Sequence, residues 1–243
     1  MTRYLNIVTA KQFGIDVAES RIEGVEPMRR MGHNLNVGAT WETVWCRSTL
    51  YSYLSAADNV DIVSDSAEDK VDGTGARSFL IKGLDANYAL QSETIVPKGA
   101  TPVASVNKYL RIFTVKAILP GSGGVNAGNI TLADVTTSTT LAFMHAGEGK
   151  TLMALWTVPA DKKVTILRWS YGEVDAKRTH VAMFVRPYGK CWYIGKIKMI
   201  KNQTSGSTLA MPIVFAEKTD IEIRAYSIGG SGAAQATMEG YYK

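Results

Sequence analysis

The sequence predicts an all-β protein with an antiparallel β-sandwich fold. We expect two jelly-roll-like sandwiches that follow an extended N-terminal arm. From Trp41 onward, short segments alternate apolar and polar residues or run apolar, as strands do. Clusters of turn-forming residues separate them, and this punctuation favours an antiparallel sandwich over βαβ units. With 243 residues and 46% hydrophobic content, the chain can bury a core as one large β domain or two small ones.

Residues 1–37 differ from the rest of the chain. They show little strand alternation and mix charged residues with Gly14, Gly24, Pro27 and Gly32. A short helix is expected over 15–22. We expect the remainder to be an extended arm that lies across a neighbouring subunit and loses its entropy on docking. A disordered terminus is the alternative.

The first predicted sandwich covers residues 38–146. Its expected strands are 43–47, 50–54, 60–63, 78–82, 90–96, 110–117, 129–134 and 139–145. Turn residues cluster between them at 57–59, 64–75, 97–99 and 119–124.

The second predicted sandwich covers residues 147–243 and joins the first near 146–150. Its expected strands are 152–158, 163–173, 180–186, 191–200, 208–214, 221–227 and 234–242. Within 221–227, Ile221 and Ile223 face one side while Glu222 and Arg224 face the other. The halves share no strict sequence repeat, so one larger sandwich stays open.

The net charge of +5 has its cations concentrated in the second half. Lys196 and Lys198 flank Ile197, which is typical of a half-exposed strand, so we expect solvated strand faces and no nucleic-acid partner. No apolar run is long enough to cross a bilayer. The N-terminus is too short and too polar for a secretory signal, and we expect the protein to stay in the cytoplasm until it is assembled.

The two cysteines, Cys46 and Cys191, lie in apolar or aromatic segments and belong to no Cys-x-x-Cys pair. We expect both to be free, buried thiols. A disulfide between them stays open, because distance in sequence does not determine distance in space.

Two glycine-rich segments are similar to nucleotide-binding motifs, and neither satisfies one. In the GEGKT segment at 147–151, the first P-loop glycine would fall at Met144, and no helix is expected to follow. In Gly121-Ser-Gly123, the third glycine of a dinucleotide fingerprint would fall at Asn126. We expect a turn that lets the chain cross between sheets, and no nucleotide cofactor.

The sequence presents no expected catalytic, cofactor or metal residue. His33, His145 and His180 are far apart in sequence and lack metal-ligand spacing. No Gly-x-Ser-x-Gly segment anchors a hydrolase. An acidic loop could offer oxygen ligands to calcium, but its spacing fits no EF-hand and a solvated loop is expected. Its residues are Asp58, Asp61, Asp65, Asp69 and Asp72.

One region carries a family resemblance: GTGAR at 73–77, GLDANY at 83–88 and ETIV at 93–96. It resembles the GTGAR…GLDxNY…ETV core of a virion structural protein family of tailed, often marine, bacteriophages. The segments at 22–38, 121–130 and 149–160 are also similar to this family. Met31 stands where the family usually has Phe, and Trp156 where it has Tyr.

The resemblance implies a non-enzymatic structural protein of a bacteriophage particle. We expect a head decoration or cement protein that binds the major capsid protein, or other virion proteins, through the arm and one sandwich, as a homotrimer in the virion. A component of the tail or of the head–tail connection is the alternative within this class. From another class, a carbohydrate-binding module could contact host glycans through Trp169 or Trp192.

The oligomer hypothesis also has a sequence feature of its own. The expected strand 234–242 ends in Tyr241 and Tyr242, which alternation would place on opposite faces. An outward tyrosine is a common interface anchor, so the second sandwich is expected near the axis of a trimer.

Overall fold

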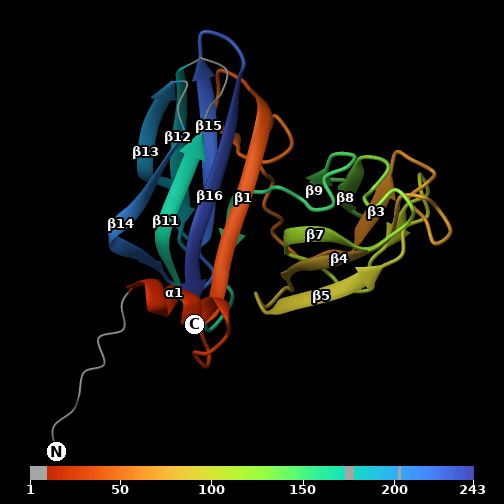
Figure 1. Ribbon diagram of the computed structural model, residues 1–243, viewed down its shortest axis with the longest axis horizontal. Helices are drawn as coiled ribbons and strands as arrows, with labels where there is room; N and C mark the ends of the chain where they lie inside the picture. The colour runs from red at the N-terminus through yellow and green to blue at the C-terminus, as the bar shows by residue number, and fades with distance from the viewer. Residues whose placement is uncertain (1–9, 173–177, 202–203) are drawn as a thin grey trace, which may run out of the picture.

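The computed structural model describes residues 10–172, 178–201 and 204–243 and is all-β, as predicted. The described residues form four antiparallel sheets and one helix. Figure 1 shows the sheets gathered in a large lobe and a small lobe. Together they resemble a four-bladed propeller more than a clear jelly roll. No helix among these residues is both long enough and apolar enough to span a membrane.

The large lobe holds two sheets made of strands from both ends of the chain. The first sheet has the strand order β1-β16-β11-β14. The second sheet has the strand order β10-β15-β12-β13, and β2 also pairs with β15 in it. Their bounds are β1 (Glu26–Val37), β2 (Glu42–Thr43), β10 (Leu155–Thr157), β11 (Val164–Gly172), β12 (Arg178–Arg186), β13 (Tyr193–Lys201), β14 (Thr204–Phe215), β15 (Asp220–Ile228) and β16 (Gly232–Tyr242).

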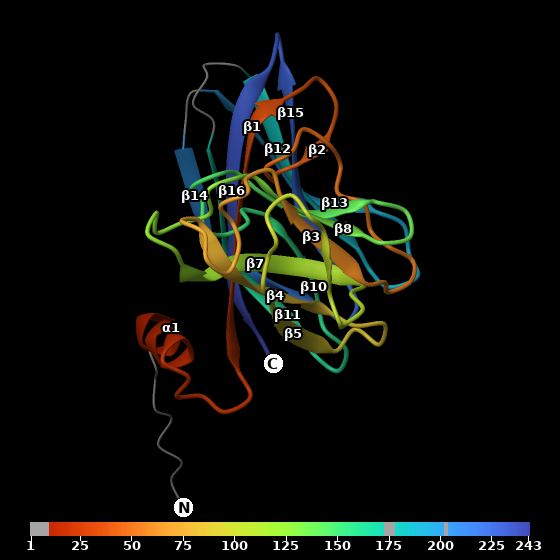
Figure 2. The same cartoon turned by 90° about the vertical axis from the view of Figure 1, so that its right-hand side faces the viewer.

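The small lobe holds the other two sheets, of order β6-β3-β8-β9 and β5-β4-β7. Their bounds are β3 (Val60–Ser64), β4 (Ala76–Leu84), β5 (Leu90–Ile95), β6 (Val103–Ala104), β7 (Arg111–Pro120), β8 (Ile130–Asp134) and β9 (Thr140–Met144). From residue 10 onward, the chain thus starts in the large lobe, forms the small lobe and returns (Figure 1). Figure 2 turns the small lobe toward the viewer, in front of the large lobe.

The predicted N-terminal arm is wrong from residue 26 onward. β1 pairs with β16 from Glu26 to Val37 and buries Met28 and Val37 in the core. Glycine, proline and asparagine interrupt its alternation, which is why it was not recognised as a strand. The predicted helix exists as α1 (Ala10–Ala18), displaced toward the N-terminus from 15–22.

Other boundaries also move. Because β2 pairs with β15, the segment after residue 38 belongs to the large lobe, although it was predicted to start the first sandwich. The predicted strand 50–54 is irregular; the Tyr51 amide donates to Thr43 Oγ1 instead of to a neighbouring strand. The predicted strand 163–173 ends at Gly172, and its last residue lies outside the described ranges.

The GTGAR segment is fixed by close backbone approach to the glycine-rich crossover. The amides of Gly121 and Gly123 donate to the carbonyls of Gly75 and Thr74 at 2.6 and 2.8 Å. A Cβ on Gly75 would overlap Asp69, and one on Gly121 would overlap the backbone at residues 73–74. Only glycine allows this contact, so these two segments of the resemblance are a matched pair in the fold.

The GLDANY segment forms the β4–β5 turn that the sequence predicts. Asp85 Oδ1 accepts the amides of Asn87 and Ala89, both at 2.8 Å, and Tyr88 has a positive φ of 64°. Asp85 therefore acts as an Asx-turn residue.

Candidate site at the junction of the two lobes

A buried ion pair connects the lobes. Arg111, the first residue of β7, contacts Asp220, the first residue of β15, with 3.1 Å between Nε and Oδ1. Both are almost fully buried, and Asp220 also accepts from Thr157 Oγ1 at 2.6 Å and from Arg186 Nε at 2.9 Å. Five donor groups from Arg111, Thr157 and Arg186 thus compensate the buried carboxylate, as a buried charge requires.

A second contact involves Arg30 of β1. Its guanidinium carbon lies 4.2 Å from the ring centroid of Trp156 and 5.3 Å from that of Phe113. Nη1 donates to Thr114 Oγ1 at 2.9 Å, which ties β1 to β7. Burial lowers the pKa of Arg30 to about 10.

A groove of about 670 Å³ lies beside Arg30, between the lobes. Arg30, Lys82, Lys116 and Lys150 line it, with Glu26 as its single acidic residue. Burial, followed by repulsion from Arg30 and Lys116, lowers the pKa of Lys150. This charge arrangement favours an anionic group in the groove.

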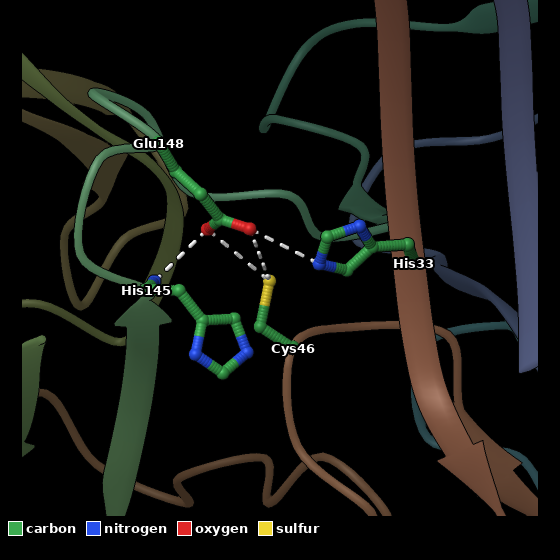
Figure 3. Close-up of side chains that lie close together, drawn as sticks. All are labelled: His33, Cys46, His145 and Glu148. Carbon is green, nitrogen blue, oxygen red and sulfur yellow. Dashed lines mark hydrogen bonds and ion pairs between the residues drawn. The ribbon is translucent and has the colours of Figure 1, made fainter.

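The third junction feature is a cluster of His33, Cys46, His145 and Glu148, shown in Figure 3. One ligand-type atom from each side chain lies within 4.8 Å of those of the others. His33 Nε2 is 3.1 Å from Glu148 Oε1, and Cys46 Sγ is 3.6 Å from Glu148 Oε2. The His33 and His145 ring centroids are 6.3 Å apart.

Segments from both lobes supply this cluster. His33 lies on β1 and Cys46 follows β2, whereas His145 directly follows β9 and Glu148 lies on the next turn. Gly32 lets β1 approach closely, because a Cβ there would overlap the backbone at Val44 and Ala154. The close approach places His33 beside the segment that carries Cys46.

The turn at 145–149 is held from within by Asn126, which is 1% exposed. Its Nδ2 donates to the His145 carbonyl at 2.8 Å, and its Oδ1 accepts the Gly149 amide at 2.8 Å. Gly147 and Gly149 have positive φ values of 82° and 65°. Glu148 Oε2 also accepts the His145 amide at 2.9 Å, so the GEGKT segment is a turn that orients a carboxylate.

The protonation of Cys46 argues against a nucleophilic cysteine. Burial, and next the nearby Glu148 carboxylate, raise the pKa of the Cys46 thiol to about 12. Catalytic cysteines have lowered pKa values, because the thiolate is the reactive form. The Cys46 sulfur, two imidazoles and a carboxylate at these distances are a donor set that can hold a transition metal, and metal binding would displace the thiol proton.

The structure therefore corrects the expectation that the histidines are too scattered to form a site. It brings His33 and His145 together and leaves His180 apart, stacked on Tyr226 with 4.5 Å between ring centroids. The His-x-x-Glu spacing of His145 and Glu148 was the available sequence signal. No spacing rule connects them with residues more than ninety positions earlier.

The cysteines are free, as expected, but only Cys46 is buried; Cys191 is exposed because it precedes the edge strand β13. In the acidic loop, Asp69 is buried and accepts the amides of Ala76, Ala127 and Gly128 and the Ser64 hydroxyl. These donors occupy both carboxylate oxygens of Asp69, one of the five residues on which the calcium alternative depended.

The aromatic residues singled out in the sequence are mostly internal. Trp169 is fully buried, so the structure contradicts its predicted role as a glycan contact. Trp192 is half-buried, with the guanidinium carbons of Arg186 and Arg224 4.8 and 4.6 Å from its ring centroid. The predicted outward tyrosine is also covered in part: Tyr241 packs edge-on against Phe13 of α1.

No family model matches the chain, and no curated protein matches it. Among solved structures, a Cry1Da tryptic core variant of Bacillus thuringiensis is 11% identical, with a TM-score of 0.23, over 83% of this chain and 52% of that one. The chain thus spans about half the length of that protein. A structure of the infectious bursal disease virus Gx strain is 8% identical, with a TM-score of 0.14, over 91% and 77%.

Proposed function

We propose that this protein is a non-enzymatic structural protein of a tailed-phage particle, most specifically a head decoration or cement protein that binds the capsid lattice. The observation that carries the proposal is an open, apolar edge on the large lobe. β13 and β14 are terminal strands of their sheets, and Figure 1 draws them on the side away from the small lobe. Unprotected edges of this kind pair with other chains.

The side chains at this edge support an interface. Ile194 and Ile197 of β13 are 45% and 48% exposed, and Met211 and Val214 of β14 are 83% and 58% exposed. Exposed apolar residues on edge strands are typical of protein–protein contact surfaces. Lys196 and Lys198 on the same strand suit an acidic capsid surface.

The resemblance to the GTGAR…GLDxNY…ETV family is the reason for proposing that the protein belongs to a phage particle. Its residues shape the β4–β5 hairpin and the crossover beside it, so they preserve the shape of the small lobe. The proposal includes a homotrimer, a pair of sandwiches formed by the two lobes, and localisation in the virion. Attachment is assigned to β13 and β14 and not to an N-terminal arm, because residues 26–37 belong to a sheet.

The first test is the copy number in purified virions, measured by gel densitometry against the major capsid protein. A decoration protein is expected in lattice numbers, at a fixed ratio to the capsid protein. A few copies per particle would instead place it in the tail or head–tail connection, and its absence from virions would refute the particle assignment.

The second test is binding of the purified chain to heads that lack it. The double variant Ile197→Lys and Met211→Lys should fold normally, because both residues are exposed, and should lose binding. Val106→Lys is the matched control, since Val106 is 88% exposed on the small lobe. Normal binding of the double variant would contradict the assignment of this edge.

A further inference from the structure

We propose that His33, Cys46, His145 and Glu148 form a structural zinc site that links the two lobes. The inference is independent of the particle assignment, because it depends only on these side chains. The chain has three histidines and two cysteines, and three of these five residues meet here with a carboxylate. His180 and Cys191 lie elsewhere.

The distances suit a tetrahedral ion. Zinc bonds of about 2.0–2.3 Å separate the ligand atoms of a tetrahedron by about 3.3–3.8 Å. Glu148 Oε1 lies 3.1 Å from His33 Nε2 and 3.9 Å from Cys46 Sγ, and one ligand atom from each of the four residues lies within 4.8 Å of the others. Separations near the 4.8 Å limit would have to shorten by about 1 Å when the ion binds.

The buried His33 Nε2 also suits a metal ligand. Its nearest polar partner is Glu148 Oε1 at 3.1 Å, which forms an ion pair only with a protonated imidazole, and Nε2 makes no hydrogen bond. Buried polar atoms normally have a partner. A metal ion between a neutral imidazole and the carboxylate would be the partner of both.

The donor types select the metal. Calcium and magnesium prefer oxygen ligands, and only one of these four residues supplies oxygen. A thiolate, two imidazoles and a carboxylate are the ligands that zinc takes in closed four-coordinate sites. A set of four protein ligands leaves no open position for a water or a substrate, which makes the site structural and not catalytic.

Supporting contacts orient the ligands. Asn126 fixes the turn that carries His145 and Glu148, and Glu148 also accepts the His145 amide. Metal sites depend on such outer contacts to hold ligand geometry. Because two ligands lie on large-lobe segments and two follow β9 of the small lobe, the ion would cross-link the lobes in addition to the Arg111–Asp220 pair.

The experiment uses the full chain without a histidine tag, stripped with EDTA and desalted. After zinc is added and excess removed, elemental analysis should give one zinc per chain. Cobalt added to the stripped protein should give the visible bands of tetrahedral cobalt and a sulfur-to-cobalt charge-transfer band. A folded wild-type chain that retains no zinc and shows no such band would overturn the proposal.

Four variants locate the site. Cys46→Ser should abolish the charge-transfer band and weaken zinc binding at least tenfold, and His145→Ala should weaken binding similarly. Cys191→Ser and His180→Ala are the matched controls and should bind as the wild type does. Equal loss in the controls would place the metal elsewhere. Circular dichroism checks that each variant folds. If Cys46→Ser or His145→Ala does not fold, Glu148→Gln, which keeps the side-chain size, replaces it as the test of zinc binding.

Thermal unfolding provides a second readout. Zinc bound only by the folded chain should raise the melting temperature of the stripped wild type, whereas calcium should not. The rise should be absent in Cys46→Ser and present in Cys191→Ser. An equal zinc effect in both variants, or a calcium effect in the wild type, would contradict the assignment.

Discussion

Arg111 and Asp220 form an ion pair that is buried between the two lobes, although 109 positions separate them in the chain. Arg111 belongs to the small lobe and Asp220 to the large lobe. Arg111 Nη1 also donates to the carbonyls of Leu54 and Leu110, so the guanidinium connects three segments. The relative position of the lobes therefore depends on a polar contact as well as on apolar packing.

Replacing Arg111 with methionine should lower the free energy of unfolding by about 3 kcal/mol, because it removes one partner of a buried pair. Arg186 and Thr157 continue to compensate Asp220, which keeps the loss at the lower end for such pairs. Urea unfolding measures the change. Arg29→Met is the control: Arg29 is 70% exposed and pairs with Glu239, so about 0–1 kcal/mol is expected. Equal effects would mean that the buried pair has no special role.

Asp69→Asn should destabilise the small lobe by about 1–3 kcal/mol. The Asp69 carboxylate accepts hydrogen bonds from three amides and a hydroxyl. In asparagine, an NH₂ group replaces one carboxylate oxygen, and this donor would face other donors without an acceptor between them. Chemical denaturation compares this variant with Asp72→Asn, an exposed residue of the same loop that should change little. A neutral Asp69→Asn would show that the loop relaxes around the amide.

Deleting residues 1–36 should prevent folding of the large lobe. The deletion removes almost all of β1, exposes the edge of β16 and takes Met28 out of the core. Deleting residues 1–25 removes α1 but keeps β1, and should cost much less. Circular dichroism and limited proteolysis distinguish the two truncations. If the chain that lacks residues 1–36 folds like the full-length protein, the result would support the extended arm that the sequence predicts.

The free energy of unfolding is expected to depend on pH through Glu222. Burial raises the pKa of Glu222, and the opposing effects of Arg224, Tyr53 and Thr43 are smaller. Because the folded chain then holds this proton more tightly than the unfolded chain, the contribution of Glu222 to stability is greatest below the ordinary glutamate pKa and falls as pH rises through the raised value.

Urea unfolding at several pH values, compared between wild type and Glu222→Gln, tests this expectation. The wild type should lose stability relative to the variant as pH rises from the ordinary glutamate range. Glu19→Gln, whose side chain is about half exposed, is the control. A difference between wild type and Glu222→Gln that is constant with pH would contradict the raised pKa.

The sequence predicted the all-β class and most of the strands, because strand alternation and turn chemistry are local properties. The β4–β5 hairpin is an example: Asp85 specifies the turn between Leu84 and Leu90, because its carboxylate accepts the amides of Asn87 and Ala89 a few residues on. β1 was missed for the same reason, since its Gly32, Asn34 and Asn36 interrupt the pattern that identifies a strand.

The sequence by itself determined the all-β class, most of the strands and which residue types were present to bind a ligand. Only the tertiary structure decided that β1 completes a sheet with β16, and that His33 and Cys46 meet His145 and Glu148. Local pattern cannot supply these relationships, because pairing between distant segments depends on how whole sheets pack. The polar contacts of the junction follow from that packing, and no spacing along the chain encodes them.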